Sequence, residues 1–133
     1  MKKLILLFIA FVSIVNVSNA QSKNAVVTNL SSERFKAIIA NDKVGAIIDL
    51  RTTEELKKKG YIKGAVQLDF LAADAEKQID KLDKNKTYYI YCASGGRSSD
   101  AAAYMEKSGF KRVYTLEKGI SDWLLKGFPV EQK

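Results

Sequence analysis

Apolar and polar residues follow two patterns along this chain. Short unbroken runs rich in β-branched and aromatic residues are typical of buried strands, and they occur at 44–50, 65–68, 87–92 and 112–116. Segments in which apolar residues recur every three or four positions predict helices, and these lie at 31–41, 52–60, 74–82, 98–108 and 119–126. Strands that alternate with helices predict an α/β domain with a mainly parallel central sheet flanked by helices.

Capping residues define the ends of several predicted helices. Ser31 stands where an N-cap side chain is needed. Thr52 and Glu55 form the T-x-x-E pattern of a capping box, and Gly60 is placed to end that helix. Gly109 is placed in the same way after the helix predicted at 98–108. The helix predictions therefore rest on end signals as well as on periodicity.

The first 20 residues have the pattern of a cleaved secretory signal peptide. A charged start at 1–3 precedes an apolar run at 4–17, and 18–20 places small residues at both positions that a signal peptidase reads. The apolar run is shorter than the roughly 20 residues that span a bilayer, and no cysteine near the cut could carry a lipid. We expect cleavage after Ala20, one domain at 21–133 and no stable membrane association afterwards.

The charge of the mature chain is mildly basic. Without Lys2 and Lys3, 20 basic residues remain against 15 acidic ones, scattered among one another. The longest basic run, 57–59, is explained by a solvated helix face. We therefore expect no nucleic-acid partner, and a bias toward small anionic molecules.

The counts of cysteine and histidine exclude several kinds of chemistry. The chain has one cysteine, Cys92, and no histidine. An internal disulfide, a Cys-x-x-Cys redox pair, a multi-cysteine zinc site and a Cys-His nucleophile pair are all ruled out. We expect no metal and no cofactor, and Cys92 must act without an imidazole base.

Cys92 lies at the carboxyl end of a predicted strand, where ligands bind in sheets of this kind. The loop that follows, Cys92-Ala93-Ser94-Gly95-Gly96-Arg97, contains adjacent glycines that let backbone N–H groups converge on one anion. The helix expected from Ser98 and the charge of Arg97 add positive potential. These features favour a reactive thiolate, although a free cysteine can also be an inert buried residue.

Four stretches of the chain resemble the rhodanese family of sulfurtransferases in its single-domain form. They are "IIDLRTTEE", "GYIKGAVQL", "YCASGGRS" and "GFKRVYTLEKGISDW", in the family's order, and the resemblance as a whole extends from about Val27 to Pro129. Three positions depart from the family. Tyr61 stands where many members have His, Lys118 where many have Gly, and Ala93 where a basic residue is common. The resemblance implies the three-layer rhodanese fold, and Ala93 implies weaker binding of thiosulfate.

The resemblance also implies a reaction. Cys92 would attack the outer sulfur of a small anionic donor such as thiosulfate, form a persulfide, and pass the sulfur to cyanide or a thiol. Backbone N–H groups of residues 93–98 would hold the sulfur, and Arg97 would orient the donor. A protein could also accept the sulfur. We expect a monomer.

The roles of four nearby polar residues stay open. Asp49 and Arg51 follow a strand and could support the site, or Arg51 could pair with Glu55 or the neighbouring loop. Ser94 and Ser98 could donate hydrogen bonds to bound sulfur, although Ser98 could simply cap its helix.

Two other functional classes are compatible with a reactive cysteine. A cysteine-dependent phosphatase typically has Cys-x5-Arg, whereas Arg97 gives Cys-x4-Arg here. A non-catalytic redox or persulfide-carrier module would keep the fold and use Cys92 differently. We expect the exported protein to act in the periplasm, where sulfur acceptors are near, or outside the cell.

Overall fold

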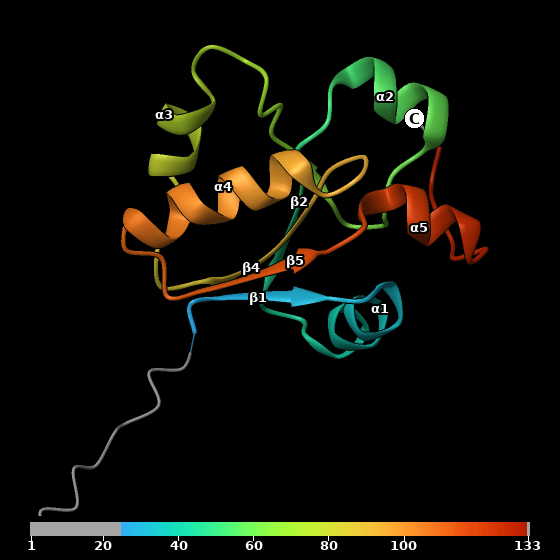
Figure 1. Ribbon diagram of the computed structural model, residues 1–133, viewed down its shortest axis with the longest axis horizontal. Helices are drawn as coiled ribbons and strands as arrows, with labels where there is room; N and C mark the ends of the chain where they lie inside the picture. The colour runs from blue at the N-terminus through green and yellow to red at the C-terminus, as the bar shows by residue number, and fades with distance from the viewer. Residues whose placement is uncertain (1–24, 133) are drawn as a thin grey trace, which may run out of the picture.

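A central parallel sheet organises the protein. The computed structural model describes residues 25–132, so the predicted signal peptide at 1–20 lies outside the described residues. Within 25–132, five strands form one sheet in the order β1-β5-β4-β2-β3, and every neighbouring pair is parallel. The strands are β1 (Val27–Leu30), β2 (Ala46–Asp49), β3 (Val66–Gln67), β4 (Thr87–Tyr91) and β5 (Arg112–Leu116). Their carboxyl ends lie at one edge of the molecule (Figure 1).

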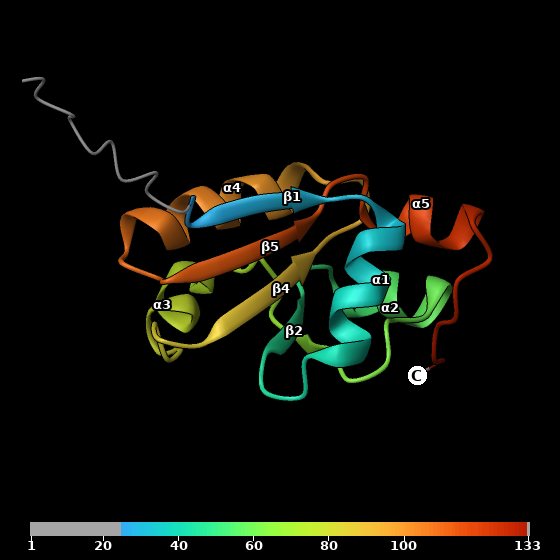
Figure 2. The ribbon, with the colours of Figure 1, turned by 90° about the horizontal axis from the view of Figure 1, so that it is seen from below.

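Helices cover both faces of the sheet, which gives three layers (Figure 2). The helices of the described range are α1 (Ser32–Asn41), α2 (Thr53–Lys59), α3 (Ala75–Asp80), α4 (Gly96–Lys107) and α5 (Gly119–Leu125). Helices α3 and α4 pack on one face, and α1 and α5 pack on the other. Helix α2 lies with α5 near the carboxyl ends of the strands (Figure 1). The predicted α/β fold with a parallel sheet is confirmed.

The central strand β4 divides the core into two halves. Tyr88 and Ile90 join the cluster under α3 and α4, while Tyr89 and Tyr91 join the cluster under α1 and α5. All four side chains are buried, because successive residues of a strand face opposite sides of a sheet covered on both faces. Cys92 continues the first series and faces the α3–α4 side. The alternation therefore fixes the direction of the Cys92 side chain.

The predicted helix caps agree with the structure. Ser31 Oγ accepts from the Arg34 N–H at 3.3 Å. At the start of α2, Thr52 Oγ1 accepts from the Glu55 N–H at 3.3 Å, and Glu55 Oε2 accepts from the Thr52 N–H at 2.9 Å. The capping box is complete, and α2 stops at Gly60 as expected.

Strand β1 and the start of α4 are two of the places where the structure differs from the sequence prediction. Strand β1 was not expected, because its four residues carry no buried apolar run, and only Leu30 is fully covered. Its position is set by pairing with β5, from Val27 opposite Val113 onward. Helix α4 starts at Gly96, two residues before the expected Ser98. The early start shortens the loop after Cys92 and brings the helix N-terminus nearer to the sulfur.

The described helices are also short relative to a bilayer. None of those between residues 25 and 132 is long and apolar enough to cross a membrane.

Candidate active site

Cys92 occupies the carboxyl end of the central strand β4. Only 1% of the residue is exposed. The chain then turns through Ala93, Ser94 and Gly95 and enters α4 at Gly96. Gly95 has φ of 108° and serves as the N-cap of α4, a conformation that favours glycine. The turn therefore curls around the sulfur.

Hydrogen-bond donors of the loop converge on the sulfur of Cys92. The Gly95 N–H donates to Sγ at 3.2 Å. The thiol donates to Ser98 Oγ at 3.7 Å, and that hydroxyl donates to the Gly95 carbonyl at 3.0 Å. If the thiol loses its proton, the Ser98 hydroxyl can turn to donate to the sulfur. Ser98 thus lies beside the sulfur and is not the N-cap of its helix.

The same contacts favour the ionised sulfur. Burial raises the pKa of the Cys92 thiol, but hydrogen bonds from the backbone and side chain of Ser98 and from the backbone of Gly95 and Ser94 outweigh it. The pKa of Cys92 is therefore lowered. A lowered pKa makes a cysteine reactive because the thiolate is the nucleophile. The backbone cradle expected from the glycine-rich loop is present in this geometry.

The first turn of α5 is hydrogen-bonded to the start of the loop. The Ile120 N–H donates to the Cys92 carbonyl at 2.9 Å, and the Ser121 N–H donates to the Ala93 carbonyl at 3.0 Å. Gly119, with φ of 65°, lies so close that a side chain there would overlap the backbone of Ala93 and Ser94. The carbonyls of Cys92 and Ala93 bond to α5. Because the N–H group of a trans peptide points away from its carbonyl, the N–H groups of these peptide units are turned toward the sulfur side of the loop.

Arg97 is bound to helix α2. Its Nη1 and Nη2 donate to Glu55 Oε2 and Oε1 at 2.8 and 2.7 Å. This bidentate pair lowers the pKa of Glu55 to about 2. Of the two partners expected for Arg51, Glu55 is wrong, because Glu55 accepts from Arg97 and the Thr52 N–H. The neighbouring loop is right, because Arg51 donates to the Gly60 carbonyl. Arg97 therefore reaches sideways from the loop to α2.

Asp49 and Arg51 form a buried ion pair beside the loop. Arg51 Nη2 donates to Asp49 Oδ2 and to the Gly60 carbonyl, both at 2.7 Å, and its Nε donates to Asp49 Oδ1 at 3.0 Å. The guanidinium also lies over the Tyr91 ring, 5.7 Å from its centre. Burial lowers the pKa of Arg51, but the bonds to Asp49 outweigh it and the pKa is raised. The pair braces the end of β2 against α2.

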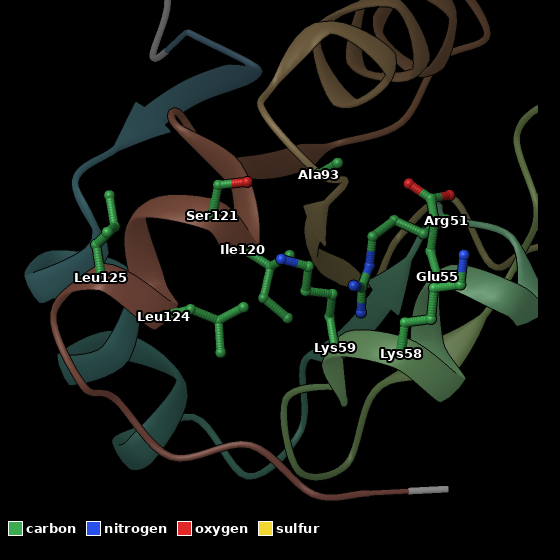
Figure 3. A pocket seen from close by; sticks show the side chains of 9 residues that line it. All are labelled: Arg51, Glu55, Lys58, Lys59, Ala93, Ile120, Ser121, Leu124 and Leu125. Carbon is green, nitrogen blue, oxygen red and sulfur yellow. The ribbon is translucent and has the colours of Figure 1, made fainter.

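A pocket of about 490 Å³ opens between α2 and α5. It is lined by Arg51, Glu55, Lys58, Lys59, Ala93, Ile120, Ser121, Leu124 and Leu125 (Figure 3). Of the predicted site residues it includes Ala93 and Arg51, and Cys92 is not among its lining residues. Lys58 and Lys59 line the pocket, and all three residues of 57–59 are exposed on α2, as expected of a solvated helix face. The α5 residues had no sequence signal, because their helical spacing indicated core packing.

The chain matches a known protein family. A family model described as a rhodanese-like domain matches residues 31–126, so this protein belongs to the rhodanese family. YrkF of Bacillus subtilis, named as a candidate sulfur carrier protein, is 38% identical over 77% of this chain and 54% of its own length. A sulfurtransferase of Allochromatium vinosum is 31% identical over 79% of this chain and 95% of its own length.

Solved structures share the same fold. The polysulfide-sulfur transferase homodimer of Wolinella succinogenes matches with a TM-score of 0.68 and 25% identity, over 84% of this chain and 82% of that chain. This chain spans about half the length of YrkF and nearly all of the Allochromatium protein. The relatives support sulfur transfer as the general chemistry of this protein.

Proposed function

We propose that this protein is a sulfurtransferase that carries a sulfane sulfur as a persulfide on Cys92. The observation that carries the proposal is the contact between Sγ and the Gly95 N–H at 3.2 Å, together with the lowered pKa of the thiol. Because the chain has no histidine, the nucleophile must be ionised by its surroundings. The loop supplies those surroundings without a general base.

The reaction has two steps. The Cys92 thiolate attacks the outer sulfur of thiosulfate, the bond between the two sulfur atoms breaks, and sulfite leaves with the bonding electron pair. A nucleophile such as cyanide or a thiol then attacks the outer sulfur of the persulfide, and the Cys92 thiolate leaves. The N–H groups of the loop stabilise negative charge on sulfur in both steps, as preorganised donors do in other active sites.

Backbone groups and Arg97 have different roles in this proposal. The N–H groups of Ser94, Gly95 and Ser98 hold the sulfur, and Ala93 lines the approach. Arg97 keeps the loop in place through Glu55 and adds positive potential near Cys92. Asp49 and Arg51 would support the site by fixing the end of β2 to the Gly60 carbonyl after α2.

Intact-protein mass spectrometry under non-reducing conditions tests the proposal. Wild type and Cys92→Ser are weighed before and after incubation with thiosulfate. A gain of one sulfur atom on wild type alone, removed by cyanide, is the expected result. If neither thiosulfate nor an organic sulfane donor adds sulfur to wild type, the proposal fails, and a phosphatase assay becomes the next measurement.

A persulfide carrier is a second candidate. The name of YrkF as a candidate sulfur carrier favours it, and it differs from the enzyme in having a protein acceptor. Persulfide that survives small thiols and cyanide but disappears on mixing with a second protein would favour the carrier. Rapid multiple turnover with cyanide would favour the enzyme.

We further propose that the protein is exported to the periplasm, cleaved after Ala20 and active as a monomer. The charged start, apolar run and small residues of 1–20 support export. N-terminal sequencing of protein from a cell fraction tests this, since a start other than Gln21 would contradict cleavage at that bond. Sedimentation of the mature protein tests the monomer.

A further inference from the structure

We propose that a second pocket, between α1 and the C-terminal segment, binds an amphipathic organic anion. Such a ligand is a small molecule with one anionic head and an apolar body. The name α1 pocket means the cavity of about 430 Å³ that is lined by Lys36, Ile39, Lys43, Ile62, Lys63, Trp123 and their neighbours. This inference goes beyond the proposed function, because it concerns a part of the molecule that the sulfur chemistry does not use.

The α1 pocket and the sulfur of Cys92 lie on opposite faces of the sheet. Cys92 belongs to the cluster under α3 and α4, whereas Ile62 and Trp123 belong to the cluster under α1 and α5. Neither Cys92 nor any residue of 93–98 lines the α1 pocket. A ligand bound in the α1 pocket is therefore out of reach of the Cys92 thiolate.

Hydrogen bonds fix the C-terminal segment as one wall of the α1 pocket. Trp123 Nε1 donates to the Pro129 carbonyl at 3.0 Å. The Tyr61 N–H donates to the Glu131 carbonyl at 2.9 Å, and the Glu131 N–H donates to the Tyr61 carbonyl at 2.8 Å. Pro129 and Glu131 both line the pocket. Because these bonds hold the wall in place, the cavity is formed before a ligand arrives, as most ligand sites are.

The uncharged lining residues of the α1 pocket are all apolar. Ile62 and Trp123 are buried, and Ile39 and Ile47 are partly buried against the same cluster. A ligand that covers what remains exposed of these side chains gains free energy in proportion to the apolar area removed from water. The volume of the pocket lies within the range of sites that bind organic small molecules. The body of the ligand is therefore apolar.

The charged lining residues favour an anion. Lys36, Lys43 and Lys63 give three positive charges and Glu131 gives one negative charge, so the net charge of the lining is 3 − 1 = +2. None of the three lysines forms an ion pair with another residue of the described range. Positive potential beside an apolar lining complements a molecule with an anionic head and an apolar body.

Two of the lysine ammonium groups are already positioned. Lys36 Nζ lies 4.6 Å from the centre of the Phe128 ring, which is a cation–π contact. Lys43 Nζ donates to the carbonyl of Ala40 at 2.9 Å, and Ala40 also lines the pocket. A side chain that is held in place loses less conformational freedom when it binds a ligand than a free one does. Lys36 and Lys43 are therefore suited to bind the head of the ligand.

Trp123 supplies a reporter for the test. It is the only tryptophan of the chain and it lines the α1 pocket. A bromine atom quenches indole fluorescence at close contact, so a brominated ligand is detected only when it lies near Trp123. The probes are ω-bromooctanoate and its neutral analogue ω-bromooctanol, and sulfate serves as an inorganic competitor. Titration of the tryptophan emission gives the apparent Kd of each bromo compound.

We expect ω-bromooctanoate to quench Trp123 saturably. It should bind about three- to tenfold more tightly than ω-bromooctanol at low salt, because exposed charge pairs contribute modestly, and the difference should shrink as salt rises. Sulfate at matched ionic strength should not displace it. Cys92→Ser should bind both compounds like wild type, since the sulfur faces the other side of the sheet.

Two pairs of variants locate the binding. Lys36→Gln should weaken binding of ω-bromooctanoate by about two- to fivefold, whereas Lys77→Gln, exposed on α3 and outside the pocket, should match wild type. Ala40→Glu adds a carboxylate to the lining and should weaken binding by about fivefold or more. Its control is Ala37→Glu, an exposed position of the same helix that does not line the pocket.

Three results would overturn the inference. If ω-bromooctanoate does not quench Trp123 saturably, the α1 pocket is not a ligand site. Equal affinity for the acid and the alcohol would show that the ligand class is wrong. If Lys36→Gln and Ala40→Glu behave like their controls, the probe binds elsewhere. None of these measurements depends on persulfide formation, so failure here is distinct from failure of the proposed function.

Discussion

Arg97 and Glu55 join the active-site loop to a helix 42 residues earlier in the chain. The guanidinium donates to both carboxylate oxygens, at 2.8 and 2.7 Å, and the same carboxylate closes the capping box of α2. One glutamate thus stabilises a helix end and fixes an arginine at the start of α4. The charge of Arg97 is thus paired within the protein.

Replacing Glu55 with Gln should give a pH-dependent loss of stability. The folded-state pKa of Glu55 is about 2, against an ordinary value of 4.5. A lowered pKa stabilises the fold fully above about pH 4.5, and the contribution is lost as pH falls toward 2. The free energy of unfolding of Glu55→Gln should therefore lie below wild type at neutral pH, and the gap should close on acidification. Urea unfolding from pH 7 to pH 2.5 measures it, and a gap independent of pH would contradict this account.

Replacing Ser98 with Ala should raise the pKa of Cys92. The variant loses the hydroxyl that lies 3.7 Å from the sulfur, and a hydrogen bond to a charged group contributes about 1.5–3 kcal/mol. Since less thiolate is then present at neutral pH, alkylation by iodoacetamide should slow by about tenfold, and its pH profile should move upward. Ser99→Ala, an exposed neighbour, is the control. Equal profiles for the two variants would remove Ser98 from the cradle.

Gly119 and Gly127 allow the cost of backbone strain to be measured apart from the cost of a steric clash. Gly119 has φ of 65° and Gly127 has φ of 68°, but a side chain would meet the Ala93 backbone only at Gly119. Gly127→Ala should cost about 1–2 kcal/mol from backbone conformation alone. Gly119→Ala should cost more and should also abolish persulfide formation, because the loop must move. Urea unfolding and the sulfur-addition assay measure both effects, and a Gly119→Ala protein with normal sulfur addition would contradict the tight fit.

Removing one partner of the buried Asp49–Arg51 ion pair should lower the free energy of unfolding more than most single substitutions do. Asp49 and Arg51 are 0% and 1% exposed, and removal of one partner leaves a buried charge unpaired. Asp49→Asn should lower the free energy of unfolding by about 3–5 kcal/mol, while Asp100→Asn on the exposed side of α4 should change it by less than about 0.5 kcal/mol. A similar small change at both positions would show that water reaches Arg51.

Sequence patterns predicted the parts of this protein that depend on local interactions. The capping box of Thr52 and Glu55, the glycine-rich turn after Cys92 and the buried strand at 87–92 each follow from neighbouring residues. The sequence could not show that Glu55 also binds Arg97, because that contact depends on how α2 is placed against α4. Strand β1 was missed for the same reason, since its pairing with β5 rather than its composition makes it a strand.

The pocket between α2 and α5 was not predicted from the sequence. Lysines at 57–59 have the composition of a solvated helix face, and Leu124 has the spacing of a core residue. Their arrangement around one cavity depends on the crossing of α2 and α5, which periodicity does not contain. The fold and the position of Cys92 at the start of its loop could therefore be predicted, whereas the pocket between α2 and α5 required the structure.

The hydrogen bonds from Ile120 and Ser121 to the loop carbonyls fix the shape of the loop without using its side chains. The cradle is built by backbone atoms and held by a neighbouring helix, so the side chains at 93 and 94 do little to maintain it. Substitutions at these two positions should therefore leave the surroundings of the Cys92 sulfur in place. The loop is therefore a practical place for engineering, because its outer side chains can be exchanged without rebuilding the backbone around Cys92.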